Sequence, residues 1–347
     1  MNMTTRVSRL RGDRVTLAHG GGGRAMRDLI EEVFTDVFRP PGREDQARLT
    51  SEALQEAGAQ LAFTTDGYVV TPVEFPGGDI GKLAVCGTVN DLAVGGARPL
   101  WLSASFIIEE GCEIALLRRI AATMAAEAEA AGVRIVTGDT KVVEKGGCDT
   151  LFVTTSGVGA IPPGRDIAAV NIRPGDVAIV NGVLGDHGAT ILAARGDLAL
   201  STPIESDCAA LGHLMEDVIA AAPGMRAARD LTRGGLASAL NEMAAEAGVT
   251  VELSDEALPI RPEVRGMCEI LGLDPLYLAN EGRAVLFVPE AQAEAALAAM
   301  RARPEGEGAA VVGRAVTAGR IPVVTKTAFG GTRIVDMLVG EQLPRIC

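Results

Sequence analysis

The sequence lacks the features that mark membrane, secreted and nucleic-acid-binding proteins. Its 347 residues contain no apolar run of the roughly 18 residues that a membrane span needs. The first residues, MNMTTRVSRLRGDRVTLAHGGGG, are basic but lack the apolar stretch of a signal peptide. We therefore expect a cytoplasmic protein with no membrane contact. A net charge of −13, with no strong Lys/Arg run, argues against a nucleic-acid partner.

Cysteine is scarce and shows no metal-binding or disulfide spacing. The six cysteines are Cys86, Cys112, Cys148, Cys208, Cys268 and Cys347. None forms a CxxC pair, which makes a disulfide framework or a four-cysteine zinc site improbable. The first five lie in apolar or helical surroundings, where cysteine usually acts as a small buried hydrophobe. Cys347 ends the segment EQLPRIC, where chains are most mobile and exposed, and is either a stray thiol or a reactive one.

The familiar phosphate-binding loops are also missing. The nearest approach to a Walker A loop, PGGDIGKLA, has Pro76 and Leu83 at two required positions. No GxGxxG opens a helix after a strand, as a Rossmann fold requires. Four glycines do precede a predicted helix: Gly20, Gly21, Gly22 and Gly23. Their backbone N–H groups could face an anion, although a flexible linker is the alternative.

Length and composition indicate a globular chain with two domains. Hydrophobic residues make up 48% and the mean hydropathy is +0.23, enough for two cores. Residues 162–176 are rich in Pro and Gly and mark the boundary. We expect a glycine-rich segment and helix in 1–45, a first domain in 46–163, a second in 172–325, and a tail in 326–347. Strands and helices alternate irregularly in both halves, which predicts an α/β (α+β) fold with a mixed or antiparallel first sheet.

Hydrophobic periodicity gives the expected elements. Helices are predicted at 24–38, 79–97, 113–132, 207–221, 234–247 and 290–302. Strands are predicted at 99–108, 149–161, 177–182, 249–253 and 284–289. Two further segments, 60–75 and 133–143, are predicted to be a strand, a turn and a second strand.

Aspartates with small neighbours are the main candidates for a functional site. Asp66 lies in FTTDGYVV, Asp91 in TVNDLAVGG, Asp139 in VTGDTKVV and Asp230 in ARDLTRGGLA. We interpret them as lying in tight turns, where small neighbours let a metal ion and phosphate oxygens approach. Several such carboxylates could hold Mg²⁺ ions that bridge a triphosphate. The alternative is that they are ordinary turn and N-cap residues.

Lys141 and Glu281 are further candidates. Lys141 follows Asp139 by two residues and could neutralise a phosphoryl group. Glu281, in LANEGRAVLF, precedes a predicted strand and could act as a base. For each of them a solvated surface charge is the alternative. The three histidines, at 19, 187 and 213, do not share the spacing of metal ligands.

Six motifs in one order carry a resemblance that covers nearly the whole chain. They are TTDGYVVTP, VNDLAVGGARP, VTGDTKVV, PGDVAIVNGVLGDHGA, DLTRGGLA and ANEGR. They resemble the superfamily of aminoimidazole ribonucleotide synthetase, selenophosphate synthetase and thiamine-monophosphate kinase. Within it, the terminal PRIC is similar to that of the HypE family of hydrogenase maturation factors, the carbamoyl dehydratases.

The resemblance implies a fold and a site. The fold is a homodimer in which the first-domain sheets pair into a β-barrel, with ATP and Mg²⁺ beside it, an α/β sandwich as second domain and a flexible tail. By similarity, Asp66, Asp91 and Asp230 bind metal and phosphate, while Asn90, Asp139 and Thr140 line the same groove. The same similarity makes Gly20–Gly23 a cover for the nucleotide rather than a linker. Lys141 and Glu281 match positions that activate the group on Cys347.

The resemblance also implies a reaction. A partner carbamoyltransferase, HypF, places a carbamoyl group on Cys347. The amide oxygen attacks the γ-phosphate of ATP, a base removes the amide protons, and loss of phosphate leaves a thiocyanate. The nitrile then passes to a HypC–HypD complex and becomes the cyanide ligand on the iron of [NiFe]-hydrogenase.

Three functions other than carbamoyl dehydration are the alternatives. Selenophosphate synthetases commonly carry a catalytic Cys or selenocysteine in the N-terminal glycine-rich region, whereas the first cysteine here is Cys86, within a predicted helix. A phosphotransferase similar to thiamine-monophosphate kinase would leave Cys347 without a role. A nucleotide-binding scaffold that only presents its tail to partners is the alternative that is not an enzyme.

Overall fold

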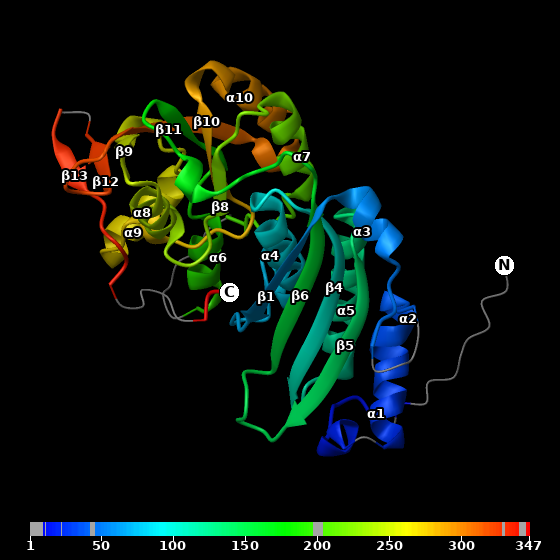
Figure 1. Cartoon of the computed structure of the whole chain (residues 1–347). Helices are drawn as coiled ribbons and strands as arrows, with labels where there is room; N and C mark the ends of the chain where they lie inside the picture. The colour runs from blue at the N-terminus through cyan, green and yellow to red at the C-terminus, as the bar shows by residue number, and fades with distance from the viewer. Residues whose placement is uncertain are drawn as a thin grey trace.

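Two β-sheets, built from successive parts of the chain, organise the computed structural model (Figure 1). The structure describes residues 10, 12–21, 23–41, 46–196, 204–327, 330–339 and 345–347. None of the helices in these ranges has both the length and the apolar character needed to cross a lipid bilayer.

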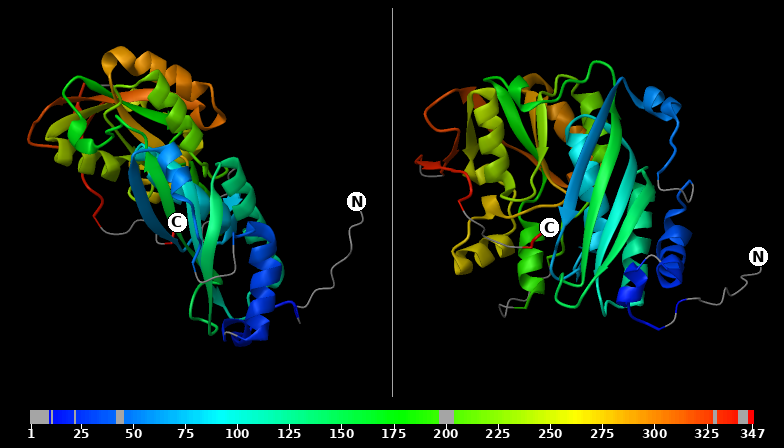
Figure 2. Two further views of the ribbon diagram at one scale, coloured as in Figure 1. Left: turned by 45° about the vertical axis from the view of Figure 1, so that its right-hand side comes forward. Right: turned by 60° about the horizontal axis from the view of Figure 1, so that its bottom comes forward.

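The first sheet is mixed, as the sequence predicts. Its order is β1 (Gln60–Tyr68), β6 (Leu151–Ile161), β4 (Arg98–Glu109) and β5 (Arg134–Val143). Only the β4–β5 pair is parallel. Helices α4 (Ile80–Val94) and α5 (Ile114–Ala130) cover one face, and within the described residues no helix covers the other, here called the bare face (Figures 1 and 2). A small hairpin, β2 (Glu74–Phe75) and β3 (Gly78–Asp79), leads into α4.

The turns predicted at Asp66 and Asp139 are wrong. β1 continues through Asp66, opposite Thr155, and β5 continues through Asp139, opposite Ser105. A Cβ atom on Gly138 would lie 2.1 Å from the carbonyl oxygen of Ala104. This glycine therefore permits close approach of two strands and does not mark a turn. Asp91 lies inside α4, so only Asp230 lies at the end of a strand.

The N-terminal helical segment packs along the β4–β5 side of the first sheet. It runs as η1 (Leu17–Gly20), α1 (Arg24–Leu29), a π-helical turn η2 (Ile30–Thr35) and α2 (Asp36–Phe38), followed by α3 (Ser51–Ala57). The uniform helix predicted at 24–38 is thus interrupted by π-helix. Phe34 stacks on Phe106 of β4 with ring centroids 4.4 Å apart, which fixes the segment against the sheet.

The second sheet has seven strands with helices on both faces. Its order is β13 (Thr332–Ile334), β12 (Val323–Lys326), β9 (Val249–Ser254), β11 (Gly308–Thr317), β7 (Asp176–Gly182), β10 (Ala284–Pro289) and β8 (Ala227–Asp230). Helix α8 (Gly235–Ala247) packs on one face, and α7 (Gly212–Ala221) and α10 (Ala293–Arg301) pack on the other. Ile179 and Val180, neighbours on β7, accordingly enter opposite cores. The predicted α/β sandwich is confirmed.

The remaining elements of the second half connect this sandwich. They are η3 (Ala169–Asn171), α6 (Asp186–Ala194), η4 (Asp255–Ala257), α9 (Pro262–Leu271), η5 (Pro275–Tyr277), η6 (Glu290–Gln292) and η7 (Pro304–Gly306). β13 lies within the segment predicted as a tail and pairs with β12. The last residues return to the side of β1 (Figure 1).

Helix α4 belongs to the cores of both halves. Leu83 and Val85 pack in the first core, whereas Ala93 and Val94 pack in a core of the second half with α7. A helix that is apolar all round is one that is buried all round, and 13 of its 15 residues are buried. α4 therefore carries Asp91 at the junction of the two halves.

Gly87 of α4 lies against Tyr68 of β1, and a substitution there tests the packing of the helix on the first sheet. A Cβ atom there would lie 2.4 Å from the Tyr68 hydroxyl oxygen. We expect Gly87→Ala to lower the free energy of unfolding by about 1–3 kcal/mol, the usual cost of overpacking. The matched control is Gly266→Ala on α9, where the added methyl group meets open space. This control should raise the free energy of unfolding by about 0.5–1 kcal/mol, because alanine favours the helix more than glycine does. Urea unfolding measures both, and equal stability of Gly87→Ala and wild type would contradict the packing.

Candidate active site

Three of the predicted aspartates converge at the junction of the two halves. Asp66 comes from β1, Asp91 from α4 and Asp230 from the end of β8. Burial raises the pKa of Asp91, as does the charge of Asp66. Burial, followed by the charges of Asp91 and Asp66, raises the pKa of Asp230 to about 7. The carboxylates are therefore close enough to repel one another in a partly dry site.

This donor set fits a hydrated Mg²⁺ ion. Mg²⁺ prefers carboxylate oxygens and usually keeps several waters, with one or two carboxylates and the substrate phosphates as its other ligands. In the part of the chain that the structure describes, no three His, Cys, Asp or Glu side chains already converge like the ligands of a metal ion. With a phosphate supplying further ligands, Asp66, Asp91 and Asp230 could hold such an ion, and its charge would relieve their repulsion.

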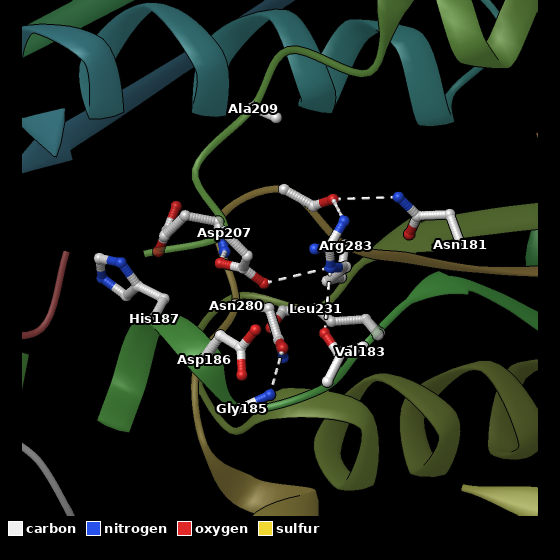
Figure 3. Close-up of polar contacts among 12 residues, drawn as sticks. Asn181, Val183, Gly185, Asp186, His187, Asp207, Ala209, Leu231, Asn280 and Arg283 are labelled. Atoms are coloured by element: carbon white, nitrogen blue, oxygen red, sulfur yellow. Dashed lines mark hydrogen bonds and ion pairs between the residues drawn. The ribbon is translucent and has the colours of Figure 1, made fainter. Parts of the chain in front are cut away.

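The loop that carries Glu281 is locked on both sides. The Asn280 side chain accepts a hydrogen bond from the Gly185 N–H at 2.7 Å and donates to the carbonyl of Leu231. Arg283 donates to the Val183 carbonyl at 3.0 Å and lies 3.5 Å from the buried carboxylate of Asp207 (Figure 3). These contacts explain the motif ANEGR as a frame that holds the glutamate in place.

Gly282 makes this frame possible, because a Cβ atom there would lie 1.9 Å from the carbonyl oxygen of Asp207. Asp207 in turn accepts a hydrogen bond from the Glu281 N–H at 2.9 Å. The Glu281 side chain is buried, and its Oε1 has no hydrogen-bond partner among the described residues. Burial, then the charges of Asp207 and Asp230, raises the pKa of Glu281 well above its ordinary value. A carboxyl group of this kind is suited to exchange a proton with a neighbouring ligand.

The C-terminus lies beside this cluster. The main-chain carbonyls of Cys347 and Arg345 accept hydrogen bonds from the N–H groups of Val69 and Thr71, at 3.1 and 3.3 Å. Ile346 is 4% exposed and Cys347 is half-buried against the first core. Ile346 and Cys347 therefore lie inward, because main-chain hydrogen bonds and an apolar side chain dock them, whereas Arg345 stays exposed.

Docking changes the chemistry of the thiol. Burial raises the pKa of Cys347 far above its ordinary value, and the negative charge of Glu281 adds to the effect while Arg233 opposes it. The thiolate is the nucleophilic form of cysteine, so the docked thiol is a poor nucleophile at neutral pH. The docked position favours an uncharged sulfur group.

A second group of predicted residues lies at the opposite edge of the first sheet. Asp139, Thr140 and Lys141 are on β5, with the Lys141 ammonium 2.7 Å from the Asp139 carboxylate. The Lys141 side chain lowers the pKa of Asp139. Gly20 packs against Val142 of the same strand, where a Cβ atom would lie 2.9 Å from the Val142 Cβ. Gly21 follows η1 and Gly23 precedes α1, while Gly22 lies outside the described residues.

A groove of about 650 Å³ separates the N-terminal helical segment from β4 and β5, a size typical of small-molecule sites. It is lined by Gly23, Asp139 and Thr140, together with Arg27, Phe34 and Phe106. Arg27 is not among the residues predicted from the sequence. Its position in the helix that follows the glycine run, where anions bind, is the signal that could have found it.

The two groups do not meet within one chain. β1 and β5 are the two edges of a four-stranded sheet, which puts roughly 14 Å, three strand spacings, between them. Asn90, predicted to line the nucleotide groove, is buried on α4. Its amide donates to the carbonyls of Ala209 and Glu281 and accepts from the Leu211 N–H. These bonds connect α4 to the loop that carries Glu281.

Comparisons with known proteins agree with this architecture. The family of AIR synthase related proteins matches with its N-terminal domain at residues 44–161 and its C-terminal domain at residues 173–326. The chain is 81% identical over 338 residues to the carbamoyl dehydratase HypE of Rhodobacter capsulatus, covering 97% of this chain and 99% of that protein.

Two solved structures are also similar. The crystal structure of the hydrogenase maturation protein HypE in complex with ATP has a TM-score of 0.90 and 45% identity, with 96% of this chain and 99% of that one covered. The HypE–HypF complex has a TM-score of 0.78 and 43% identity, with 89% and 99% covered.

The buried carboxyl group of Glu281 should make stability depend on pH. The pKa of Glu281 is raised in the folded state. Its contribution to the free energy of unfolding is therefore fully present below the unfolded pKa, about 4.3, and is lost as pH rises. Glutamine stays neutral, and the stability of Glu281→Gln relative to wild type should therefore increase from pH 5 to pH 8. Urea unfolding at both values measures this. The exposed Glu144→Gln is the control, and a difference that does not change with pH would refute the burial of a titrating group.

Proposed function

Because this chain belongs to the carbamoyl dehydratase HypE family of AIR synthase related proteins, we propose that it dehydrates an S-carbamoyl group on its own Cys347 to a thiocyanate, using ATP. The main support for this proposal is that Cys347 docks beside Glu281, Asp66 and Asp230. A cysteine that lies among candidate phosphate- and proton-handling groups of its own chain is placed to be a substrate.

The reaction balances without a further reactant. The thiocarboxamide RS–C(=O)NH₂ and ATP give RS–C≡N, ADP and phosphate. The amide oxygen bonds to the γ-phosphorus and the bond to ADP breaks. The amide nitrogen then loses its two protons as the carbon–oxygen bond breaks and phosphate leaves. Glu281 in its ionised form is the candidate for accepting a proton from the nitrogen.

Charge on the transferring phosphoryl group must be offset. Lys141 supplies a positive charge for this, and Asp66, Asp91 and Asp230 would hold Mg²⁺. When bound, Mg²⁺ neutralises part of the phosphate charge. Arg27 and the glycines around Gly23 line the groove at β5, where they are candidates for nucleotide contacts. The partly dry site would also keep water from the activated intermediate.

Loading and unloading of the sulfur require partners. The docked thiol resists ionisation, so attack of a Cys347 thiolate on a carbamoyl donor is favoured only when the tail is undocked. HypF is the proposed donor, in keeping with the HypE–HypF complex of a relative. A HypC–HypD complex is the proposed acceptor, which would deliver cyanide to the iron of [NiFe]-hydrogenase. All six cysteines are unpaired, which fits the reducing cytoplasm.

We further propose that the working unit is a homodimer. The bare face carries Leu61 and Phe63, 64% and 68% exposed, and Lys141 lies on it because its neighbour across the ladder is Ile107. Pairing of two bare faces into a β-barrel would cover these apolar side chains. It would also bring β5 of one chain toward β1 of the other, and so unite Lys141 with Glu281.

Cys347→Ala tests the main proposal. We expect wild type, incubated with HypF, carbamoyl phosphate and Mg·ATP, first to gain the mass of a carbamoyl group on the C-terminal peptide and then to lose the mass of water. Cys347→Ala should show neither change, and its ATP turnover under these conditions should fall to background. Intact-protein and peptide mass spectrometry measure both steps. Identical ATP turnover in the two proteins, or no loss of water in wild type, would refute the proposal.

Complementation tests the shared site. Lys141→Ala and Glu281→Gln should each be nearly inactive alone. When the two variants are co-expressed, random pairing makes half of the dimers mixed, each with one intact site, which predicts about a quarter of wild-type activity. Formation of thiocyanate on Cys347 is the readout. A mixture no more active than either variant would show that Lys141 and Glu281 act within one chain.

A further inference from the structure

His187 links the C-terminus to the second half of the molecule. It lies in the first turn of α6 and is fully buried, at the edge of the polar cluster in Figure 3 with its ring turned away from Arg283. Its Nε2 is 2.8 Å from the carbonyl oxygen of Ile346, and its Nδ1 is 2.8 Å from Ser206 Oγ. The edge of the ring also packs on Phe75, with centroids 5.6 Å apart.

The neighbours of the ring fix where its proton lies. Ser206 Oγ accepts a hydrogen bond from the Cys208 N–H at 3.2 Å, so the hydroxyl proton is free to point at His187 Nδ1. The proton of a neutral imidazole then sits on Nε2, where it is donated to the Ile346 carbonyl. Burial lowers the pKa of His187 to about 4, which keeps the ring neutral at physiological pH.

Four hydrogen bonds to the tail use its main-chain oxygens, and the Arg345 side chain also forms an ion pair with Asp149. Besides the His187 bond, Val69 and Thr71 donate their N–H groups to Cys347 and Arg345, and Arg195 donates to the Arg345 carbonyl at 2.7 Å. These bonds leave the Cys347 sulfur free to carry a thiol, carbamoyl or cyano group. The docked tail is therefore held in the same way whatever its cargo.

The His187 bond holds the main-chain carbonyl that directly precedes Cys347. Val69 and Thr71 bind the main-chain oxygens of alternate tail residues, and His187 binds the intervening carbonyl from the second half of the molecule. The chain turns at Arg345, which has a φ of 55° and is held separately by Arg195 and by an ion pair with Asp149. Without the His187 bond, the Ile346–Cys347 peptide could rotate and turn the sulfur away from Glu281.

We propose that His187 is a positioning residue for the reaction, which fixes the orientation of the Ile346–Cys347 peptide in the docked tail by donating to the Ile346 carbonyl, with Ser206 selecting the tautomer. Its effect on docking depends only on the structure of the tail. Its effect on catalysis rests on the proposed function, since it acts by holding the carbamoyl group on Cys347 beside Glu281.

Alkylation of Cys347 tests the docking step. The other five cysteines are buried, so iodoacetamide labelling of the C-terminal peptide, followed by mass spectrometry, reports how often the tail undocks. His187→Phe keeps an aromatic ring against Phe75 but removes the donor, and should raise the labelling rate about tenfold, the effect of losing about one buried hydrogen bond. His187→Gln, which restores an N–H donor, should label more slowly than His187→Phe. Labelling of His187→Phe at the wild-type rate would overturn the proposal.

A second measurement separates positioning from general damage. After loading by HypF, His187→Phe should convert its thiocarboxamide to thiocyanate about tenfold more slowly than wild type, while the loading step is not slowed. Ser206→Ala keeps the imidazole ring but removes the hydroxyl that selects its tautomer. It should raise the Cys347 labelling rate and lower the conversion rate, each by less than His187→Phe does. Equal slowing of loading and conversion would overturn the positioning role. If labelling changes as expected but wild type forms no thiocyanate, the docking role stands and the proposed function fails.

Discussion

Burial of carboxyl groups beside Cys347 is the constraint on which the rest of the structure depends. An uncompensated buried carboxylate destabilises a fold by several kcal/mol, and here Asp66, Asp91, Asp230 and Glu281 share one partly dry site. The surrounding elements hold them in place: α4 is shared by two cores, and the loop before β10 is tied by Asn280 and Arg283. The same burial suppresses the thiolate of Cys347, so one physical cause both activates a carboxyl group and protects the sulfur.

The division of the candidate site between two sheet edges follows from this constraint. Lys141 would neutralise the carboxylates if it lay among them, but in one chain it pairs with Asp139 on the bare face. In the proposed homodimer the positive charge comes from the second chain. The complete set of charges would then exist only in the assembled dimer, where the β-barrel also shields it from water.

Sequence patterns predicted the elements that have strong hydrophobic periodicity. They missed features that depend on the close approach of main-chain segments. Helix α8 matches its predicted range to one residue, because its apolar spacing and the flanking Gly234 and Gly248 mark it locally. The turns expected at Asp66 and Asp139 were wrong because glycine beside aspartate usually indicates a turn, whereas Gly138 here serves strand packing. The docked C-terminus and the role of His187 were not predictable, since main-chain carbonyls bind without any side-chain pattern.

The energetics of the tail are suited to reversible docking. Four hydrogen bonds to its carbonyls contribute about 0.5–1.5 kcal/mol each, and burial of Ile346 adds about 1.5–3 kcal/mol. Ordering three residues costs about 1–2 kcal/mol each in backbone entropy. The gains of about 3.5–9 kcal/mol and the cost of about 3–6 kcal/mol nearly offset each other, so a partner's own contacts are enough to shift the tail to the undocked state. A tail held by side-chain interlocking or a longer strand would be harder to release. Hydrogen bonds to main-chain oxygens, one of them from a histidine beside Cys347, thus reconcile accurate placement of Cys347 with its release to other proteins.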